Sequence, residues 1–237
     1  FGGRQGSGDG AHDDVLAEMA AAASGDADWR SGKTWSLVYN AGPEVEAVSK
    51  AAYQAFFSSN ALNPMAFPSL RRFETEVLAS AAALLHGAPG EAVGSMTTGG
   101  TESILMALKT ARDWGRARGI TAPEIVLPLS VHPAFDKAAH YLGLRAIYTP
   151  VGDDFRADVS AMRAALSPST VLLVGSAPSF PQGVIDDIPA IAALAEEHGA
   201  LCHVDACVGG FFLPFLERLG EPVPAWDFRV PGVPSIS

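Results

Sequence analysis

The stretch ALCHVDAC at residues 200–207 places a single carboxylate at the end of a short apolar segment. Residues 200–204 have the length and the apolar content of a buried strand, and Asp205 follows that segment directly. From about residue 94 up to this stretch, apolar strand segments alternate with helical segments. This alternation predicts an α/β fold with a mostly parallel sheet and helices on both of its faces.

The predicted elements divide the chain into three parts. Residues 1–10 predict a flexible start, residues 11–85 an N-terminal helical arm, and residues 86–237 a large sheet domain that is incomplete at its C-terminal end. The pattern predicts helices at residues 12–24, 43–58, 71–85, 101–114, 133–142, 158–166 and 188–197. Strands are predicted at residues 124–129, 145–149, 171–175 and 200–204.

The charge balance of the chain excludes some classes of partner. A formal net charge of -10 over 237 residues disfavours binding to nucleic acid or to an anionic membrane, because phosphate groups attract clustered Lys and Arg. The two cysteines, Cys202 and Cys207, lack the spacing of a zinc site, so we expect no metal. No apolar run is long enough to cross a bilayer. We therefore expect a soluble, cytoplasmic protein.

A glycine turn precedes the helix predicted at residues 101–114. The sequence TTGGTES at residues 97–103 supplies backbone amides at Gly99 and Gly100 and the positive end of the following helix, which together can bind an anion such as phosphate. An ordinary glycine-rich loop with a Thr or Ser cap is the competing interpretation.

Asp205 can play two roles. Small residues follow it at Ala206, Gly209 and Gly210 and leave room for a flat ring, and a carboxylate favours the protonated form of a nearby pyridine nitrogen. The competing role is that of a cap for the next helix. A phosphate site and a carboxylate for a ring nitrogen together suit pyridoxal 5'-phosphate (PLP), whose protonated ring accepts electrons.

His132 follows the strand predicted at residues 124–129 and precedes Pro133. In a parallel sheet, ligands bind beyond the carboxyl ends of the strands, where His132, residues 176–182 and Asp205 all fall. From this position the His132 imidazole could stack on the cofactor ring. A lone histidine also serves commonly as a structural hydrogen-bonding group.

Six motifs resemble one known family. They are TTGGTESILMA at 97–107, PEIV at 123–126, His132 with Phe135 and KAA at 137–139, FPQGVID at 180–186, HVDACVGGF at 203–211, and DFRV at 227–230. In this order they resemble the sphingosine-1-phosphate lyase family, in the PLP-dependent decarboxylase group of fold type I. The resemblance implies that the following residues contact the cofactor: Gly99, Gly100 and Thr101 at its phosphate, His132 and Ala206 on opposite ring faces, and Asp205 at the ring nitrogen.

The resemblance also implies a lysine that forms a Schiff base with the cofactor. In the family it follows the SIS stretch, found here at residues 235–237, within a few residues. The lysines of this chain, Lys33, Lys50, Lys109 and Lys137, do not occupy that position. We therefore expect the polypeptide to continue past Ser237 with this lysine and with a small C-terminal domain.

Substrate contacts follow from the resemblance as well. A tyrosine of the N-terminal arm and a histidine of a proline-rich loop bind the substrate phosphate in the family, and both reach into the site of a partner subunit. Tyr39 matches the tyrosine, whereas Asn63 stands where the histidine is expected. The resemblance thus implies a homodimer with shared active sites, and the lack of a membrane helix indicates a bacterial-type form.

Three functions remain open at this point. The favoured one is a carbon-carbon lyase that cleaves a phosphorylated long-chain amino alcohol to a fatty aldehyde and phosphoethanolamine. An amino-acid decarboxylase would need the same PLP apparatus and is the alternative. The third is a relative with this fold that has no catalytic activity.

Overall fold

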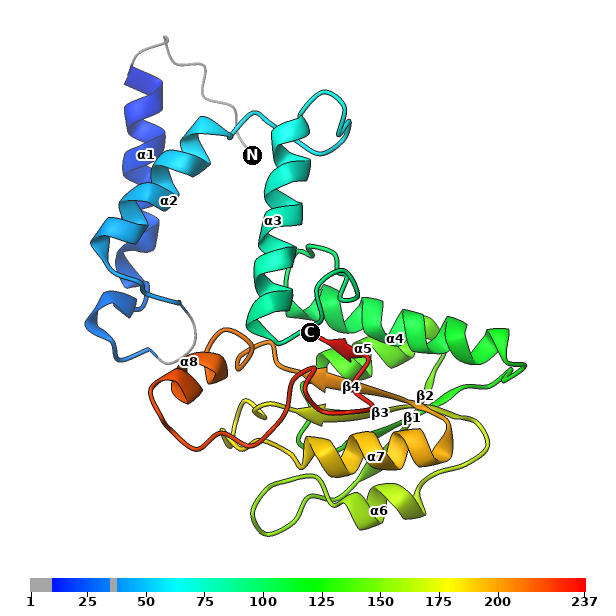
Figure 1. The fold of residues 1–237 in the computed structure, drawn as a ribbon. Coiled ribbons are helices and arrows are strands. Elements are labelled where there is room, and N and C mark those ends of the chain that lie inside the picture. The colour runs from blue at the N-terminus through cyan, green and yellow to red at the C-terminus, as the bar shows by residue number, and fades with distance from the viewer. Residues whose placement is uncertain (1–9, 35–37) are drawn as a thin grey trace. The chain divides into compact units, whose positions relative to one another are not determined.

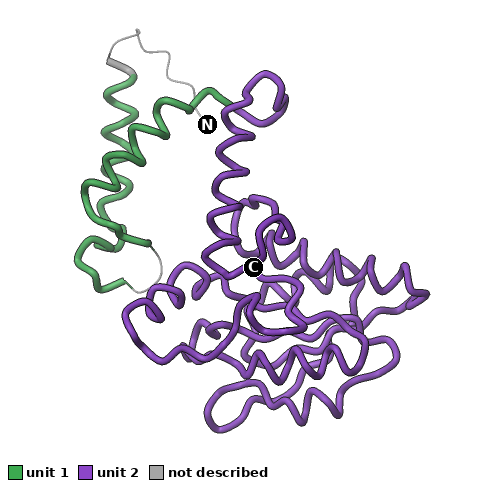
Figure 2. The backbone as a smooth tube through the Cα atoms, in the orientation of Figure 1, with its two compact units in different colours: residues 1–59 green, residues 60–237 purple. Residues whose placement is uncertain are grey.

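The computed structural model describes residues 10–34 and 38–237. The chain forms two compact units, residues 1–59 and residues 60–237 (Figure 2). The flexible start expected at residues 1–10 lies outside the described residues, except for Gly10, which begins the first helix. The predicted division at residue 85 stays a prediction, although the helix that precedes residue 85 belongs to the same compact unit as the sheet.

Unit 1 contains two helices, α1 (Gly10–Ala22) and α2 (Pro43–Ala55), and two short 3-10 turns, Ala23–Gly25 and Trp29–Ser31. Pro43 occupies the first turn of α2, where its missing N–H breaks no helical hydrogen bond. Glu46 of α2 forms ion pairs with Arg30 at 2.7 Å and with Lys50 at 2.8 Å. The pair with Arg30 joins the turn Trp29–Ser31 to α2, and the pair with Lys50 lies within α2. No residue of α2 is buried within this unit.

Unit 2 carries a five-stranded sheet whose strands are all parallel and run in the order β2-β1-β3-β4-β5 (Figure 1). The strands are β1 (Glu124–Pro128), β2 (Arg145–Thr149), β3 (Thr170–Ser176), β4 (Leu201–Asp205) and β5 (Ser235–Ile236). The helices are α3 (Pro68–Leu84), α4 (Gly100–Ala117), α5 (Ala134–Leu142), α6 (Val159–Ala164), α7 (Ile188–His198) and α8 (Leu213–Arg218). The predicted α/β fold with helices on both faces is confirmed.

Each face of the sheet buries its own apolar cluster. Side chains alternate across a strand, so Ile125 and Leu127 of β1 pack against α4 and α5, whereas Val126 packs on the side of α6 and α7. Figure 1 shows these helix pairs on opposite sides of the sheet. Because both faces are covered, the central strands are largely apolar, and every residue of β3 is buried.

The strand order reverses between β1 and β3. From β1 the chain passes to β2 at one edge, and then returns past β1 to β3, β4 and β5. Connections that leave two neighbouring strands in opposite directions open a crevice beyond their carboxyl ends, and ligands of such sheets bind there. The topology therefore places the candidate site where the sequence predicts it.

Most predicted elements are present, with small shifts at their ends. The helix predicted from residue 158 is present as α6, and Asp158 caps it, because its side chain accepts a hydrogen bond of 3.0 Å from the Ala161 N–H. Helix α3 begins at Pro68 and not at residue 71, since proline suits the first helical turn. The sequence pattern does not predict α8 or β5. Strand β5 has only two residues, which is too short for a periodic pattern, and it forms by pairing with His203 and Val204.

Among the residues described by the structure, no helix is long and apolar enough to traverse a lipid bilayer.

Candidate active site

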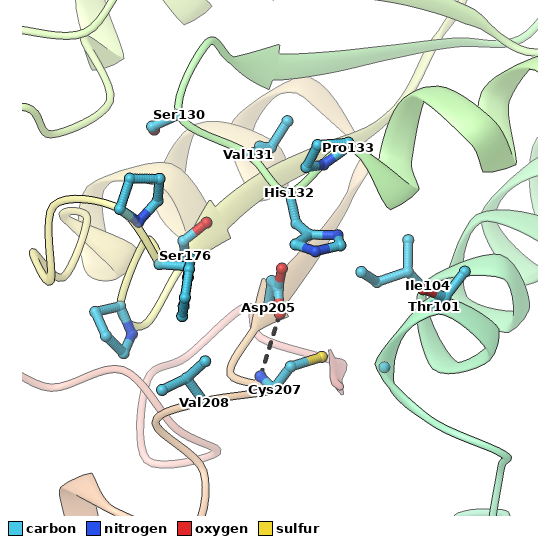
Figure 3. A pocket seen from close by; sticks show the side chains of 14 residues that line it. Thr101, Ile104, Ser130, Val131, His132, Pro133, Ser176, Asp205, Cys207 and Val208 are labelled. Atoms are coloured by element: carbon cyan, nitrogen blue, oxygen red, sulfur yellow. Dashed lines mark hydrogen bonds between the residues drawn. The ribbon is translucent and has the colours of Figure 1, made fainter. Parts of the chain in front are cut away.

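A cavity of about 410 Å³ opens beyond the carboxyl ends of β1, β3 and β4 (Figure 3). Four segments line it, namely the start of α4, the β1–α5 connection, the β3–α7 connection and the residues after β4. The lining residues are Gly100, Thr101, Ile104, Ser130, Val131, His132, Pro133, Ser176, Pro178, Phe180, Pro181, Asp205, Cys207 and Val208. The volume is in the range of small-molecule and cofactor sites.

The glycine turn forms one wall of this cavity. Gly99 has φ +150°, a backbone conformation that side chains other than glycine rarely adopt. A Cβ on Gly100 would lie 2.7 Å from Cys207 Sγ, so only glycine allows the start of α4 to approach the residues after β4 this closely. Within the described part of the chain, the N–H groups of Gly100 and Thr101 have no hydrogen-bond acceptor. They are free to bind an anion.

Glu102 fixes the conformation of the glycine turn. Its Oε2 atom accepts hydrogen bonds from the Thr98 N–H at 2.6 Å and from the Thr98 hydroxyl at 2.7 Å. The hydrogen bond from the Thr98 backbone, followed by that from its hydroxyl, lowers the pKa of Glu102. Thr97 adds a contact between its hydroxyl and that of Ser103 at 2.8 Å. These bonds use the polar groups of Thr97 and Thr98 and the Ser103 hydroxyl. They do not involve the N–H groups of Gly100 and Thr101.

Asp205 is a buried carboxylate with few partners. The residue is 8% exposed, its Oδ1 atom accepts a backbone hydrogen bond of 3.1 Å from the Cys207 N–H, and the neighbouring Cys207 thiol also interacts with the carboxylate. This bond forms a tight turn and does not cap a helix, because α8 begins only at Leu213. No Lys or Arg of the described residues pairs with Asp205. A desolvated carboxylate without a cation is unfavourable, so this site suits a ligand with a cationic group.

His203 lies two residues before Asp205 but does not neutralise it. The side chain is fully buried, and its two ring nitrogens contact the hydroxyls of Ser235 at 2.9 Å and Ser237 at 3.0 Å. Burial lowers the pKa of His203 to about 4, against a smaller upward effect of Asp205. The imidazole is therefore neutral near pH 7, and each hydroxyl can donate or accept as the ring requires.

The ring of His132 enters the cavity from the β1–α5 connection. Its Nδ1 atom accepts a hydrogen bond of 3.1 Å from the Ala134 N–H, so in the neutral ring Nε2 carries the proton. Figure 3 shows the imidazole and the Asp205 carboxylate facing the same space, with Thr101 and Ile104 across from Ser176. A flat ligand between these groups would meet an aromatic face and a carboxylate together.

The structure places some predicted site residues away from the cavity lining. Gly99 precedes the lining residue Gly100, and Ala206 lies between the lining residues Asp205 and Cys207 in the chain and is buried. Asn63 is exposed in unit 2, where its Oδ1 accepts a hydrogen bond of 3.0 Å from the Met65 N–H in a turn. Tyr39 belongs to unit 1 and is 67% exposed. The cofactor and substrate roles of these four residues stay predictions.

Other residues of the site were not singled out from the sequence. Pro178, Phe180 and Pro181 line the cavity from the segment 176–182, which was predicted to lie at this end of the sheet, whereas Ile104, Ser130 and Val208 were not predicted to take part. Their residue types carry no chemical signal in the sequence, although their position after predicted strands does. None of Lys33, Lys50, Lys109 and Lys137 lines the cavity, and Lys50 and Lys109 pair with Glu46 and Asp113. The described residues contain no cluster of His, Cys, Asp or Glu that could hold a metal ion.

Comparison with known proteins shows the family of the chain. The aminotransferase class-V family matches residues 76–210. Sphingosine-1-phosphate lyase of Dictyostelium discoideum is 45% identical over 228 residues, which cover 95% of this chain and 43% of the relative. Sphingosine-1-phosphate lyase 1 of Mus musculus is 44% identical over 225 residues, which cover 94% of this chain and 39% of the relative. The chain thus spans about two fifths of the length of these curated relatives.

A solved structure of a sphingosine-1-phosphate lyase is similar to this chain in fold as well. The sphingosine-1-phosphate lyase Bpss2021 of Burkholderia pseudomallei superposes with a TM-score of 0.87 at 38% identity, over all of this chain and 55% of that one. The predicted resemblance is confirmed by these matches. Since the relatives come from an amoeba, a mammal and a bacterium, the prediction of a bacterial-type form gains no support. This chain belongs to the aminotransferase class-V family, and within it the chain is similar in sequence and fold to sphingosine-1-phosphate lyases.

Proposed function

We propose that this chain forms the cofactor-binding part of a PLP-dependent carbon-carbon lyase that acts on phosphorylated long-chain amino alcohols. The observation that carries the proposal is the Asp205 carboxylate, which is 8% exposed, lacks a cation among the described residues, and shares one cavity with the free amides of Gly100 and Thr101. The similarity to sphingosine-1-phosphate lyases supports the choice of substrate class.

The residues of the cavity fit PLP in charge and in shape. Asp205 would pair with the protonated ring nitrogen, and the N–H groups of Gly100 and Thr101 would bind the phosphate at the start of α4. The imidazole of His132 would cover one face of the ring. When bound, PLP would supply a cationic ring that accepts the electrons of the breaking bond.

The proposed reaction is a retro-aldol cleavage. A proton leaves the C3 hydroxyl of the substrate, the bond between C2 and C3 breaks, and C2 takes up a proton, which gives a fatty aldehyde and phosphoethanolamine. In this scheme Asp205 keeps a proton on the ring nitrogen throughout, because a buried anion favours the cation beside it. Val208, Pro178 and Phe180 provide an apolar part of the lining, which would favour the exclusion of water when a ligand is bound.

The Schiff-base lysine is a further part of the proposal. Since no lysine of the described residues lines the cavity, we propose that this lysine comes from outside residues 1–237. A PLP enzyme uses such a lysine to hold the cofactor and to exchange it with the substrate amine. The gene sequence that follows Ser237 and mass spectrometry of the borohydride-reduced whole protein test this point.

A homodimer with shared sites is proposed as well. Apolar side chains remain exposed on unit 1 at Val45 and Val48, and on unit 2 at Phe211 and Phe215, and a second copy of the chain could cover such groups. In this arrangement Tyr39 and Asn63 would reach the phosphate of the substrate in the partner's cavity. Light scattering of the whole protein measures the oligomeric state.

We also propose a cytoplasmic location for the protein, which fractionation of cells tests.

The decisive assay compares two substrate classes. The whole protein with PLP is incubated with sphingosine 1-phosphate and, separately, with L-amino acids. The proposal predicts a fatty aldehyde and phosphoethanolamine from the first and no carbon dioxide from the second. Carbon dioxide from amino acids without aldehyde from the lipid would identify a decarboxylase instead, and a folded, PLP-loaded protein that is inactive on both would identify a non-catalytic relative.

A further inference from the structure

Asp186 is a second buried carboxylate close to the cavity, and the proposed chemistry does not use it. It lies at the C-terminal end of the β3–α7 connection and is 1% exposed. It does not line the cavity. Its oxygens point instead to two backbone segments, one of which forms the cavity wall.

The side chain of Asp186 connects these two segments directly. Oδ2 accepts a hydrogen bond of 2.7 Å from the N–H of Ser176, the last residue of β3, and Oδ1 accepts one of 2.8 Å from the N–H of Ala157. The N–H of Asp186 in turn donates to the Ser176 carbonyl at 3.0 Å. Ser176 and Asp186 are therefore joined by two hydrogen bonds, one through backbone and one through side chain.

These two bonds close the base of a loop that forms part of the cavity. Residues 177–185, here called the wall loop, contribute Pro178, Phe180 and Pro181 to the lining. Inside the loop, the N–H of Ser179 donates to the Val184 carbonyl and that of Gly183 to the Ser179 carbonyl, both at 2.9 Å. The position of the whole loop relative to β3 thus depends on its base, where Asp186 meets Ser176.

The same base is joined to Asp205. The N–H of Ala177 donates a hydrogen bond of 2.8 Å to the backbone carbonyl of Asp205, and Ser176 lies beside Asp205 in the register of β3 and β4. A continuous series of contacts therefore runs from the Asp186 carboxylate through Ser176 and Ala177 to the backbone of Asp205, the residue proposed to hold the ring nitrogen.

Only a carboxylate meets the requirements of this position. Two N–H groups point at the side chain, so both of its oxygens must accept, whereas an amide would present one NH₂ group to an N–H. Burial raises the pKa of Asp186, an effect that the Ser176 and Ala157 N–H groups and the nearby Arg156 oppose. Arg156 itself donates from Nε to the Ile185 carbonyl at 2.8 Å and pairs with Asp154 at 2.9 Å, so it supports the base without a direct bond to Asp186.

We propose that Asp186 is a positioning residue, which fixes the wall loop and Ser176 and thereby sets the affinity of the cavity for PLP. This inference rests on the proposed function, because it concerns the same cofactor. It extends that function by assigning a role to a residue that touches neither cofactor nor substrate.

The test compares Asp186→Asn with Asp187→Asn in the whole protein. Asp187 is the exposed neighbour, whose side chain accepts one backbone hydrogen bond of 3.1 Å at the start of α7, so it is a matched acidic residue outside the cavity wall. We expect D186N to weaken PLP binding, titrated by absorbance, at least tenfold, and D187N to change it less than about twofold. Hydrogen-deuterium exchange should rise in residues 176–185 of D186N only. Saturating PLP should restore the bound-cofactor spectrum of D186N, which misfolding would not allow.

The outcomes separate this inference from the proposed function. Wild-type protein that binds PLP together with D186N that binds it equally well, with unchanged exchange in the wall loop, overturns the inference and leaves the proposed function intact. Wild-type protein that binds no PLP overturns both. If D186N does not fold, Arg156→Gln provides the test, because it removes the bond to Ile185 and the exposed pair with Asp154 while it leaves Asp186 and its two hydrogen bonds in place. A severalfold weaker PLP affinity in R156Q supports the proposal, and an unchanged affinity contradicts it.

Discussion

The sheet has a buried carboxylate at each end of its strands, and the two differ in how they are paired. At the amino ends of the strands, Glu124 is 8% exposed, accepts an ion pair from Arg145 at 2.8 Å, and accepts a hydrogen bond from the Ser167 hydroxyl at 2.6 Å. At the carboxyl ends, Asp205 is also 8% exposed but accepts one backbone hydrogen bond among the described residues. Equal burial is thus combined with very different pairing.

The contrast extends beyond these two residues. Near Glu124, the ring of His198 contacts the Ser167 carbonyl at 2.8 Å, so the polar groups of the amino ends form a closed network. Near Asp205, the amides of Gly100 and Thr101 have no acceptor among the described residues, and the Ser130 hydroxyl is buried without a partner. Polar groups that are buried and unsatisfied are unfavourable for stability. Ser130, Gly100 and Thr101 all line the one cavity that Asp205 also lines, so a ligand bound there could pair with them.

The largest effect is expected from removing the charge of Asp205 at the carboxyl ends of the strands. Asp205→Asn should weaken PLP binding and lower lyase turnover by roughly a thousandfold, since loss of one partner of a buried ion pair costs about 3–5 kcal/mol. The measurement is a PLP titration together with an assay of aldehyde release. A folded D205N protein with near wild-type affinity would remove the basis of the contrast between the two ends.

The second effect is the pH dependence of stability, which is expected from His203, two residues before Asp205. His203 has its pKa lowered from 6.5 to about 4 by burial, so the unfolded chain binds a proton more tightly than the folded protein between these values. The stability is therefore fully present above pH 6.5 and falls as the pH is lowered toward 4, by about 3 kcal/mol in total. Urea unfolding at several pH values measures this loss.

His203→Gln provides the control for that pH dependence. Glutamine can still donate to one serine hydroxyl and accept from the other, but it does not titrate. The slope of the free energy of unfolding against pH should therefore be much smaller in H203Q between pH 4 and pH 6.5. An unchanged slope would assign the acid sensitivity to other groups and show that His203 is not held neutral by its surroundings.

The third prediction tests the close approach of the glycine turn to the residues after β4. In Gly100→Ala, the new Cβ would lie 2.7 Å from Cys207 Sγ and 3.4 Å from Cys207 Cβ, so either Cys207 or the start of α4 must shift. We expect about tenfold weaker PLP binding, equivalent to about 1.4 kcal/mol. The matched control is Gly220→Ala, at a glycine of φ +87° with open space around it, which should lower stability and leave PLP affinity unchanged. Equal effects of the two variants on affinity would contradict the prediction.

The smallest effect is expected from Glu124 at the amino ends of the strands. Glu124→Gln should lower the free energy of unfolding by about 1 kcal/mol, because the partner Arg145 is largely exposed and screened by solvent. Lyase turnover should stay within about twofold of wild type. A large loss of turnover with little loss of stability would mean that the amino ends also take part in function.

Much of this arrangement is predictable from the sequence. The apolar strand before Asp205, the glycine turn and the residues after β1 and β3 define the parallel sheet and the end at which ligands bind, because these signals are local. The unsatisfied state of Asp205 is not a local property. It depends on which cations lie elsewhere in the fold, and the sequence alone leaves ring binding and helix capping as equal alternatives.

Other features depend on contacts between distant segments. Strand β5 exists only through its pairing with β4, and the fit of Gly100 against Cys207 joins residues far apart in the chain. Asp186 belongs to the FPQGVID motif at residues 180–186, yet its bonds to Ser176 and Ala157 cannot be read from that motif. The motif identifies the residue, and the fold determines what the residue does.

The most direct test of the central claim is a crystal structure of the whole protein with PLP. We predict that the ring nitrogen lies about 2.7–2.9 Å from a carboxylate oxygen of Asp205, with the phosphate on the amides of Gly100 and Thr101. A structure in which the ring nitrogen faces another group, or in which the phosphate binds away from the glycine turn, would contradict the proposed site.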